Sequence, residues 1–400
     1  MARAEGERRT QLEGILSNAY FRLAYTANRF FDYDRAIQNY LAIADSPTFA
    51  RSSDPDVPTR ITDSLINAAR ILEYQQNYRR AAEYYGRAAE RLTDPAEQRS
   101  ARYRIAEMAF KSRDWARAVR ELQAFISRYN NDRSAVELVT QANWRIAEAR
   151  EAQNNASGHR SALQDTVSVY DRLGGTPGSM AAEYAAHSRF LIVDPSLAEL
   201  EDYTVNPGRQ ATVPVFVQTL TNQIQAGAQR TGTVASGYEP IMAYRRPIWT
   251  IAALTRQGRA YEIYARAVLN ATVTVPTDLQ RQISRASPDV REEVRLQFDD
   301  QVRQILDQRV RPIECYAVVR YALAARAAQA GNIDSEHSRE AIDRLQAYGD
   351  ERIAECIEQG RANDATLGAY RSGEFVRARR GEYIEMTPGV SAPPLAREDD

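Results

Sequence analysis

The stretch Gln76-Asn77-Tyr78-Arg79-Arg80-Ala81-Ala82-Glu83-Tyr84-Tyr85-Gly86-Arg87-Ala88-Ala89 decides the fold of this chain of 400 residues. Four of its residues recur three, four and three positions apart and therefore share one face of a helix: Tyr78, Ala81, Tyr85 and Ala88. Large and small side chains alternate on this face, so each small residue leaves a notch that a large side chain of a neighbouring helix can fill. The pattern predicts a helix that packs between other helices.

The same pattern occurs twice more. It appears first as Tyr33, Ala36, Tyr40 and Ile43, and later as Trp115, Ala118, Leu122 and Phe125. The spacing is uneven, since 45 residues separate Ala36 from Ala81 and 37 separate Ala81 from Ala118. One helical unit that recurs at intervals of this length is typical of a solenoid, in which each unit packs against its neighbours. The sequence therefore predicts an all-α fold of stacked helical hairpins.

Helix and break signals divide the chain into three parts, namely residues 11–173, 179–370 and 371–400. The first part is expected to hold about four hairpins, with a proline-rich connection at 45–59. The second is expected to continue as degenerate helical repeats, in which Pro195 and Pro312 each begin a new helix. The third loses the helical pattern and is rich in proline and charge, so it is expected to be a disordered tail.

The balance of charges argues against one class of function. The chain has 52 basic and 53 acidic residues, whereas a nucleic-acid-binding protein usually shows a basic excess or a basic stripe. Its first nine residues carry charges without the apolar core of a secretion signal, and its apolar runs are too short to span a membrane. The chain as it stands is therefore expected to be soluble and cytoplasmic, unless it is an excerpt of a longer exported protein.

The first three helical units resemble the tetratricopeptide repeat. The resemblance rests on Leu23-Ala24, Tyr33, Ala36, Tyr40 and Pro47, then on Ala68-Ala69, Tyr78, Ala81, Tyr85, Ala88 and Pro95, and then on Ile105-Ala106, Trp115 and Ala118. It implies a right-handed superhelix of hairpins whose leading helices line a concave, protein-binding groove. The uneven period departs from the family pattern, and the extra residues fall in the proline-rich connection.

A second resemblance concerns the other half of the chain. The segment Pro247–Glu262 is similar to large repeat proteins of the myxobacterial cell envelope, some of them tied to gliding motility. The likeness extends over residues 180–390 and includes no chemical motif. Those proteins are thought to act as scaffolds in the periplasm, so the resemblance implies a place in the cell envelope.

The candidate binding residues lie on the leading helices, on the side expected to point away from each trailing helix. They combine aromatic with basic side chains, which suits a peptide or an amphipathic helix laid along the groove. These residues are Phe21, Tyr25, Arg29, Arg70, Tyr74, Tyr103, Phe110, Lys111 and Trp144. The alternative for each aromatic residue is a packing role, since an aromatic side chain at helical spacing packs more often than it binds.

Little in the sequence points to chemistry. The three histidines are far apart and lack metal ligands at the usual spacing: His159, His187 and His337. Neither a phosphate loop nor a nucleophile elbow occurs, so no metal, cofactor or catalytic residue is predicted. Cys315 and Cys356 fall near the start and the end of an expected antiparallel hairpin. There they would form a disulfide in an oxidising compartment or, in the alternative, serve as two buried apolar fillers.

Three functions remain open after this reading. The favoured one is a non-enzymatic scaffold or adaptor that binds peptide or helical segments of other proteins in a bacterial envelope assembly. The alternative is a cytoplasmic adaptor of the same fold, with free cysteines and a regulatory or chaperone-like role. The third is an enzyme whose site is too scattered along the chain to be recognised.

Overall fold

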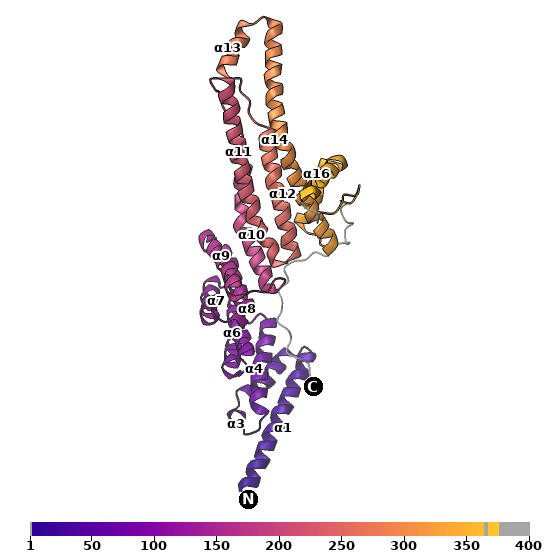
Figure 1. Ribbon diagram of the computed structural model, residues 1–400. Coiled ribbons are helices and arrows are strands. Elements are labelled where there is room, and N and C mark those ends of the chain that lie inside the picture. Colours follow the sequence, from indigo (N-terminus) through magenta and orange to yellow (C-terminus); the bar gives the residue numbers. More distant parts are fainter. Residues whose placement is uncertain (1, 364–366, 376–400) are drawn as a thin grey trace. The chain divides into compact units, whose positions relative to one another are not determined.

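The computed structural model describes residues 2–363 and 367–375, and within these ranges its regular secondary structure is helical, with no strand (Figure 1). The prediction of an all-α fold is confirmed. The chain divides into two compact units, Met1–Gly175 (unit 1) and Thr176–Asp400 (unit 2). None of the described helices combines the length and the apolar character that a membrane span requires.

Unit 1 is an array of four helical hairpins, each made of a leading and a trailing helix. Its helices are α1 (Ala2–Arg29), α2 (Tyr33–Ala44), α3 (Pro47–Ala50), α4 (Val57–Tyr74), α5 (Tyr78–Arg91), α6 (Pro95–Lys111), α7 (Trp115–Tyr129), η1 (Arg133–Ala135), α8 (Val136–Ala152) and α9 (Ala156–Leu173). The hairpins are α1/α2, α4/α5, α6/α7 and α8/α9, and within each the leading helix packs against the trailing one. Each trailing helix up to α7 also packs against the next leading helix, so the hairpins stack as the sequence pattern predicts.

The same turn closes all four hairpins. Its first residue has a left-handed backbone, with φ values of 60°, 59°, 59° and 54° at Phe31, Gln76, Arg113 and Asn154. Its second residue caps the trailing helix, because its side chain accepts a hydrogen bond from the backbone N–H three residues later. These caps are Asp32, Asn77, Asp114 and Asn155. One short polar residue at a fixed place thus sets where each trailing helix begins.

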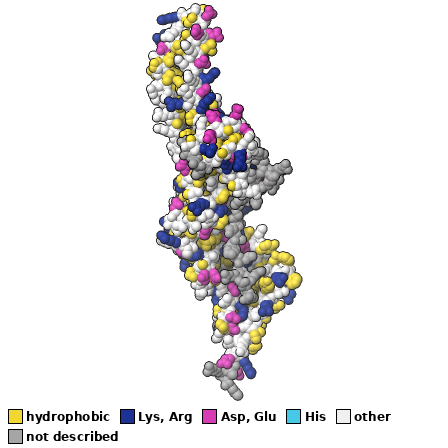
Figure 2. All heavy atoms as spheres, turned by 45° about the vertical axis from the view of Figure 1, so that its right-hand side comes forward, with side chains coloured by type: hydrophobic (Ala, Val, Ile, Leu, Met, Phe, Trp, Pro, Cys, Tyr) yellow, Lys and Arg dark blue, Asp and Glu magenta, His cyan; other side chains and the backbone are white. Residues whose placement is uncertain are grey.

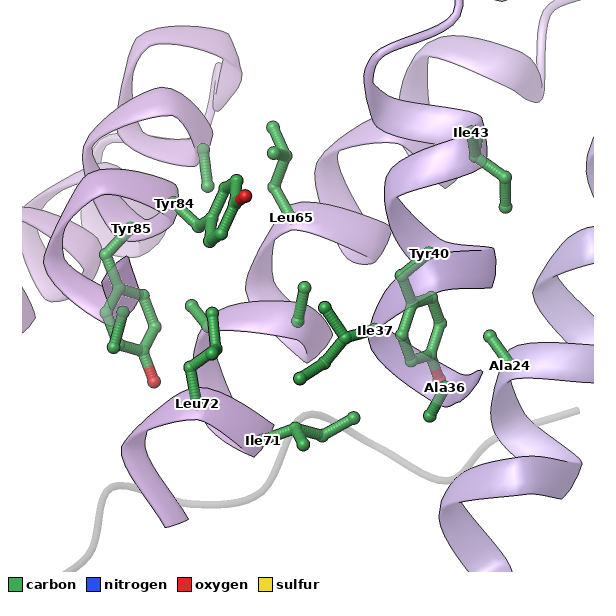
Figure 3. Close-up of a cluster of buried hydrophobic side chains, with 14 of the residues drawn as sticks. Ala24, Ala36, Ile37, Tyr40, Ile43, Leu65, Ile71, Leu72, Tyr84 and Tyr85 are labelled. Atoms are coloured by element: carbon green, nitrogen blue, oxygen red, sulfur yellow. The ribbon is translucent and has the colours of Figure 1, made fainter. Parts of the chain in front are cut away.

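The small residues of the sequence pattern lie in the core of unit 1, as predicted. Three alanines have an exposed fraction of 0%: Ala36, Ala81 and Ala118. On α2, Ile37 points toward Leu72 of α4, while Tyr40 lies beside Ala24 of α1 (Figure 3). The helix α2 therefore contributes side chains to the contacts with both of its neighbours, and the packing of large residues against small ones joins the first hairpin to the second.

Unit 2 is built from longer helices. They are α10 (Met180–Glu201), α11 (Val213–Tyr238), η2 (Glu239–Tyr244), α12 (Pro247–Leu269), α13 (Thr277–Arg285), α14 (Pro288–Gly331), α15 (Glu336–Tyr348) and α16 (Asp350–Asn363). The helix α12 packs against α10, α11, α14 and α15 and so forms the centre of the unit (Figure 1). Its close approach to α14 depends on Gly258, since a Cβ atom there would lie 2.7 Å from the ring of Tyr321.

Two expected helix breaks are wrong. Pro195 lies inside α10, and Pro312 lies inside α14, a helix of 44 residues in all. Each proline removes one backbone N–H from the helical ladder and leaves one carbonyl group without its usual partner. Both prolines are exposed, so water can bond that carbonyl group and the helix continues through the proline.

The C-terminal part of unit 2 is held against α14. Cys315 on α14 and Cys356 on α16 are both buried and form a disulfide, with an S–S distance of 2.09 Å. Residues 371–375 of the expected disordered tail are instead held against α14, because Phe375 is buried and Glu374 forms an ion pair of 2.6 Å with Arg326 on that helix. The rest of that expected tail, residues 376–400, lies outside the described residues.

Candidate protein-interaction surface

Some of the predicted groove residues belong to the core of unit 1. Tyr103 and Trp144 are buried, and the ring of Tyr103 packs edge-on against Phe125 of the trailing helix α7, with 5.4 Å between the centroids. Phe21 is half-buried and meets Tyr40 of α2 in the same way, also at 5.4 Å. All three predicted residues stand ten positions before the turn residue of their hairpin. For Tyr103 and Trp144, the assignment to an open groove is wrong.

The other predicted residues reach the surface to different degrees. Tyr25, Arg29 and Tyr74 are exposed, whereas Arg70, Phe110 and Lys111 are half-buried. Tyr74 is 73% exposed, and its ring centroid lies 5.4 Å from that of Tyr33. The ring centroid of Tyr33 lies 6.2 Å from that of Phe31. We call Phe31, Tyr33 and Tyr74 the aromatic cluster. It lies where the first two hairpins turn, and it leaves aromatic surface in contact with water.

Charged side chains link the leading helices α4 and α6. Glu73 on α4 accepts hydrogen bonds from the Nζ atom of Lys111 at 2.5 Å and from the hydroxyl group of Tyr85 at 2.9 Å. Arg104 on α6 lies 3.5 Å from the same carboxylate and pairs with Glu107 of its own helix at 2.7 Å. Burial opposes ionisation of Glu73, but these donors and cations outweigh it and hold the pKa of Glu73 below its ordinary value.

The same chemistry continues on α8. Arg145 pairs with Glu148 at 2.7 Å, and its guanidinium carbon lies 4.9 Å from the ring centroid of Phe110 on α6. Arg70 on α4 occupies the position of Glu107 and Glu148, six residues before the turn residue. We call the following set the charged ladder: Arg70, Glu73, Arg104, Glu107, Lys111, Arg145 and Glu148. Ion pairs of Glu73 join α4 to α6, and the cation–π contact of Arg145 with Phe110 joins α6 to α8.

Besides the aromatic residues, the sequence contains a repeated tetrapeptide that indicates the charged ladder. Arg104-Ile105-Ala106-Glu107 on α6 recurs as Arg145-Ile146-Ala147-Glu148 on α8. Residues three apart lie on the same side of a helix, so each arginine can pair with the glutamate of its own motif. The alanine between them is buried in both copies. A search for the repeated tetrapeptide, in place of aromatic residues, would have placed charges on this surface.

Unit 2 has a charged cavity of its own, with a volume of about 1120 Å³, next to α12 and α15. Arg256 on α12 bridges Asp194 at 3.0 Å and Glu340 at 2.9 Å, and Arg344 on α15 pairs with Glu262 on α12 at 2.7 Å. These cations already have carboxylate partners within the unit. The arrangement favours a role in holding α10, α12 and α15 together.

The two histidines of unit 2 lie among aromatic residues. His187 stacks on Trp249 with 4.0 Å between the ring centroids, and the ring of His337 lies 5.3 Å from that of Phe190. Burial lowers the pKa of each imidazole to about 4. In the part of the chain that the structure describes, no group of three or more histidine, cysteine or acidic residues could hold a metal ion.

Comparisons with known proteins give little guidance. No family model matches the chain, and no curated protein does. Among 30 solved chains that do match is the crystal structure of the apo form of RapI. It shares 10% sequence identity at a TM-score of 0.33, and the match covers 74% of this chain and 97% of that chain. A likeness at this TM-score carries no argument about the function of the chain.

Proposed function

We propose that unit 1 is a non-enzymatic protein-interaction module that binds a segment of another protein along the charged ladder and the aromatic cluster. The ladder is the observation that supports this proposal most directly. It runs over three leading helices, and the same arginine–glutamate pair recurs on α6 and α8. A segment laid across these helices would therefore meet the same pair on α6 and α8, and on α4 it would meet Arg70 at the position of the glutamate.

One end of the ladder indicates what such a segment carries. Arg70 and Tyr74 lie one helical turn apart on α4, and Lys111 reaches α4 from α6 through its ion pair with Glu73. Two cations thus lie close to a largely exposed aromatic ring. They fit a peptide or helix with a carboxylate for the cations and an apolar side chain for the ring. Arginine and tyrosine are also residue types that dominate binding energy in interfaces.

The test is a selection of random displayed peptides on the full chain, followed by affinity measurements with the purified peptides. Arg70→Glu should weaken binding about tenfold or more, because it replaces a cation with a charge that repels the carboxylate. Tyr74→Ala should weaken binding by a similar factor, because it removes the exposed ring.

Matched substitutions elsewhere control for general effects of charge and apolar surface. Arg79→Glu and Arg120→Glu make the same change on the exposed faces of the trailing helices α5 and α7, and Tyr316→Ala removes an exposed tyrosine of unit 2. None of these three should alter the affinity. Peptides that lose affinity equally with the control variants, or not at all with Arg70→Glu and Tyr74→Ala, would contradict the proposal.

We further propose that the module works in a bacterial envelope assembly. The resemblance of Pro247–Glu262 to envelope scaffold proteins supports this, and so does the pairing of Cys315 with Cys356, since disulfides persist in oxidising compartments. The rival is a cytoplasmic adaptor of the same fold. Alkylation of thiols at the moment of cell lysis, followed by mass measurement, separates the two. Two alkylated cysteines would favour the cytoplasmic adaptor.

A further inference from the structure

The helix α1 carries a regular apolar surface on the side that faces solvent. Five exposed residues of α1, together with Phe30 directly after its last residue, follow one another at spacings of four, three, four, three and four: Leu12, Leu16, Ala19, Leu23, Thr26 and Phe30. We call them the α1 seam. Its four large residues are between 51% and 78% exposed. The opposite side of the helix is the packed one, with Ser17, Ala24 and Ala27 buried.

The helix α1 packs against fewer trailing helices than the other leading helices do. The leading helix α4 packs against both α2 and α5, α6 against both α5 and α7, and α8 against both α7 and α9. Each of them therefore has a trailing helix before it and a trailing helix after it in the chain. Among the described helices, α1 packs against one trailing helix, α2. In Figure 2, hydrophobic side chains gather at the surface in the lower part of the view, where α1 lies.

A groove beside the seam extends the apolar surface. It has a volume of about 530 Å³, and its lining includes Leu12 and Leu16 of the seam, Tyr20 on the same helix and Phe49 of α3. Charged residues of both signs border it, among them Arg8 and Glu13. The surface thus has an apolar centre with a charged margin, which is the composition of a protein interface.

The spacing of the seam specifies the kind of partner that fits it. Apolar residues that alternate between three and four positions are the pattern of a coiled coil, whose two helices both carry it. Among the described helices, the exposed large apolar residues outside α1 do not form such a series: Tyr74, Val215, Leu269, Val290, Leu296 and Tyr316. The described helix that matches the α1 seam is α1 itself.

The exposed area is sufficient for self-association. The seam with its neighbour Ile15 exposes roughly 600 Å² of apolar side chain, at the upper end for a patch on a monomer. A symmetric pair would bury at most about 1,200 Å², and burial of most of this surface would reach the roughly 1,000 Å² expected of a specific interface. We propose that two copies of this chain associate through their α1 helices, seam against seam, and that this contact is separate from the charged ladder.

The experiment uses the full chain and measures its mass in solution by light scattering after size-exclusion chromatography, over a hundredfold range of concentration. The wild-type protein should approach twice the chain mass of 45.1 kDa at the high end. Leu16→Glu combined with Leu23→Glu should keep the mass at 45.1 kDa throughout, because it places four carboxylates in the paired seams. Both leucines are exposed, so the variant should keep the helical circular dichroism of the wild type.

A matched control is Leu296→Glu, since Leu296 is an equally exposed leucine on a helix of unit 2. It should leave the dimer intact. Ala19→Cys supplies a second readout, because the two natural cysteines are paired and the new thiol is then the one free to react. Mild oxidation should cross-link two chains through it, whereas Leu296→Cys should not. A wild type that remains monomeric, or a double glutamate variant that remains dimeric, would overturn the proposal; the first result would leave a helix from a different protein as the occupant.

Discussion

Units 1 and 2 hold their helices together by different means. In unit 1 one turn recurs four times, and the helices that it joins pack against their neighbours in the chain. In unit 2 the decisive contacts join residues far apart in sequence, such as Tyr321 with Glu262 at 2.7 Å and Cys315 with Cys356. The difference shows that local repetition is enough to specify an array, whereas a bundle of long helices needs particular contacts at distance. The two units should therefore respond differently to single substitutions.

The largest expected difference concerns the disulfide. Cys315→Ala combined with Cys356→Ala opens a loop whose ends are 41 residues apart, which should lower the free energy of unfolding of unit 2 by about 4 kcal/mol. Unit 1 should keep its stability. Hydrogen exchange, followed peptide by peptide, measures both units in one sample. Equal loss of protection in unit 1 and unit 2 would show that the two unfold together.

The next effect depends on pH and comes from the two buried histidines of unit 2. The pKa of about 4 for His187 and His337 lies below the ordinary value near 6.5, so below pH 6.5 the unfolded chain takes up protons that the folded chain does not. Stability should therefore fall from pH 6.5 down to about 4, by about 1 kcal/mol for each histidine at pH 5.5.

The check is urea unfolding at pH 7.5 and pH 5.5. His187→Phe keeps a ring against Trp249 and should remove about half of the histidine contribution to this pH dependence. A variant with an unchanged pH dependence would mean that the histidine is protonated in the folded protein.

Two glycines of unit 2 should respond in opposite ways to substitution by alanine. Gly258→Ala should cost about 1–3 kcal/mol, because the new methyl group would meet the ring of Tyr321, which is fully buried and bonded to Glu262. Gly232→Ala on α11 meets nothing within 4 Å and should instead stabilise the helix by about 0.5–1 kcal/mol. Thermal unfolding distinguishes these opposite signs, and a stabilising Gly258→Ala would mean that α12 and α14 lie farther apart.

The smallest effect concerns the repeated turn of unit 1. Asp114→Ala removes the cap of α7 and should cost about 1 kcal/mol, with faster hydrogen exchange at the start of that helix. Ser127→Ala, an exposed position near the end of the same helix, is the control and should change the stability by only a few tenths. Equal effects of the two substitutions would mean that the cap contributes nothing to the hairpin.

The sequence predicts the helices and buried residues of unit 1 well, because both follow from residue spacing within single helices. The buried alanines at 36, 81 and 118 follow from spacing along single helices. The candidate site is harder to predict, since the periodicity of one helix does not say how many sides its neighbours cover. Periodicity therefore assigns Tyr103 and Trp144 to the surface although they pack in the core, and the link of the charged ladder from α4 to α6 depends on ion pairs between two helices.

In unit 2, the sequence patterns fail to predict where the helices begin. A proline such as Pro312 marks the start of a new helix only if the carbonyl group that loses its N–H donor finds no other hydrogen-bond partner. The preceding helix must then end before the proline. In α14 the proline lies on the exposed side, so the helix continues and the expected hairpin boundary disappears. Such an outcome depends on which side of the helix the rest of the unit covers, and that is a property of the tertiary structure.

The left-handed residue of each hairpin turn has one more consequence. Phe31, Gln76, Arg113 and Asn154 differ widely in chemistry, yet all are exposed and share nearly the same backbone geometry. The helix cap beside each of them fixes the direction of the backbone, so the identity of the side chain is free to vary. These four sites offer attachment points for fluorophores or tethers, spaced one hairpin apart, at which chemical modification would leave the interior packing undisturbed.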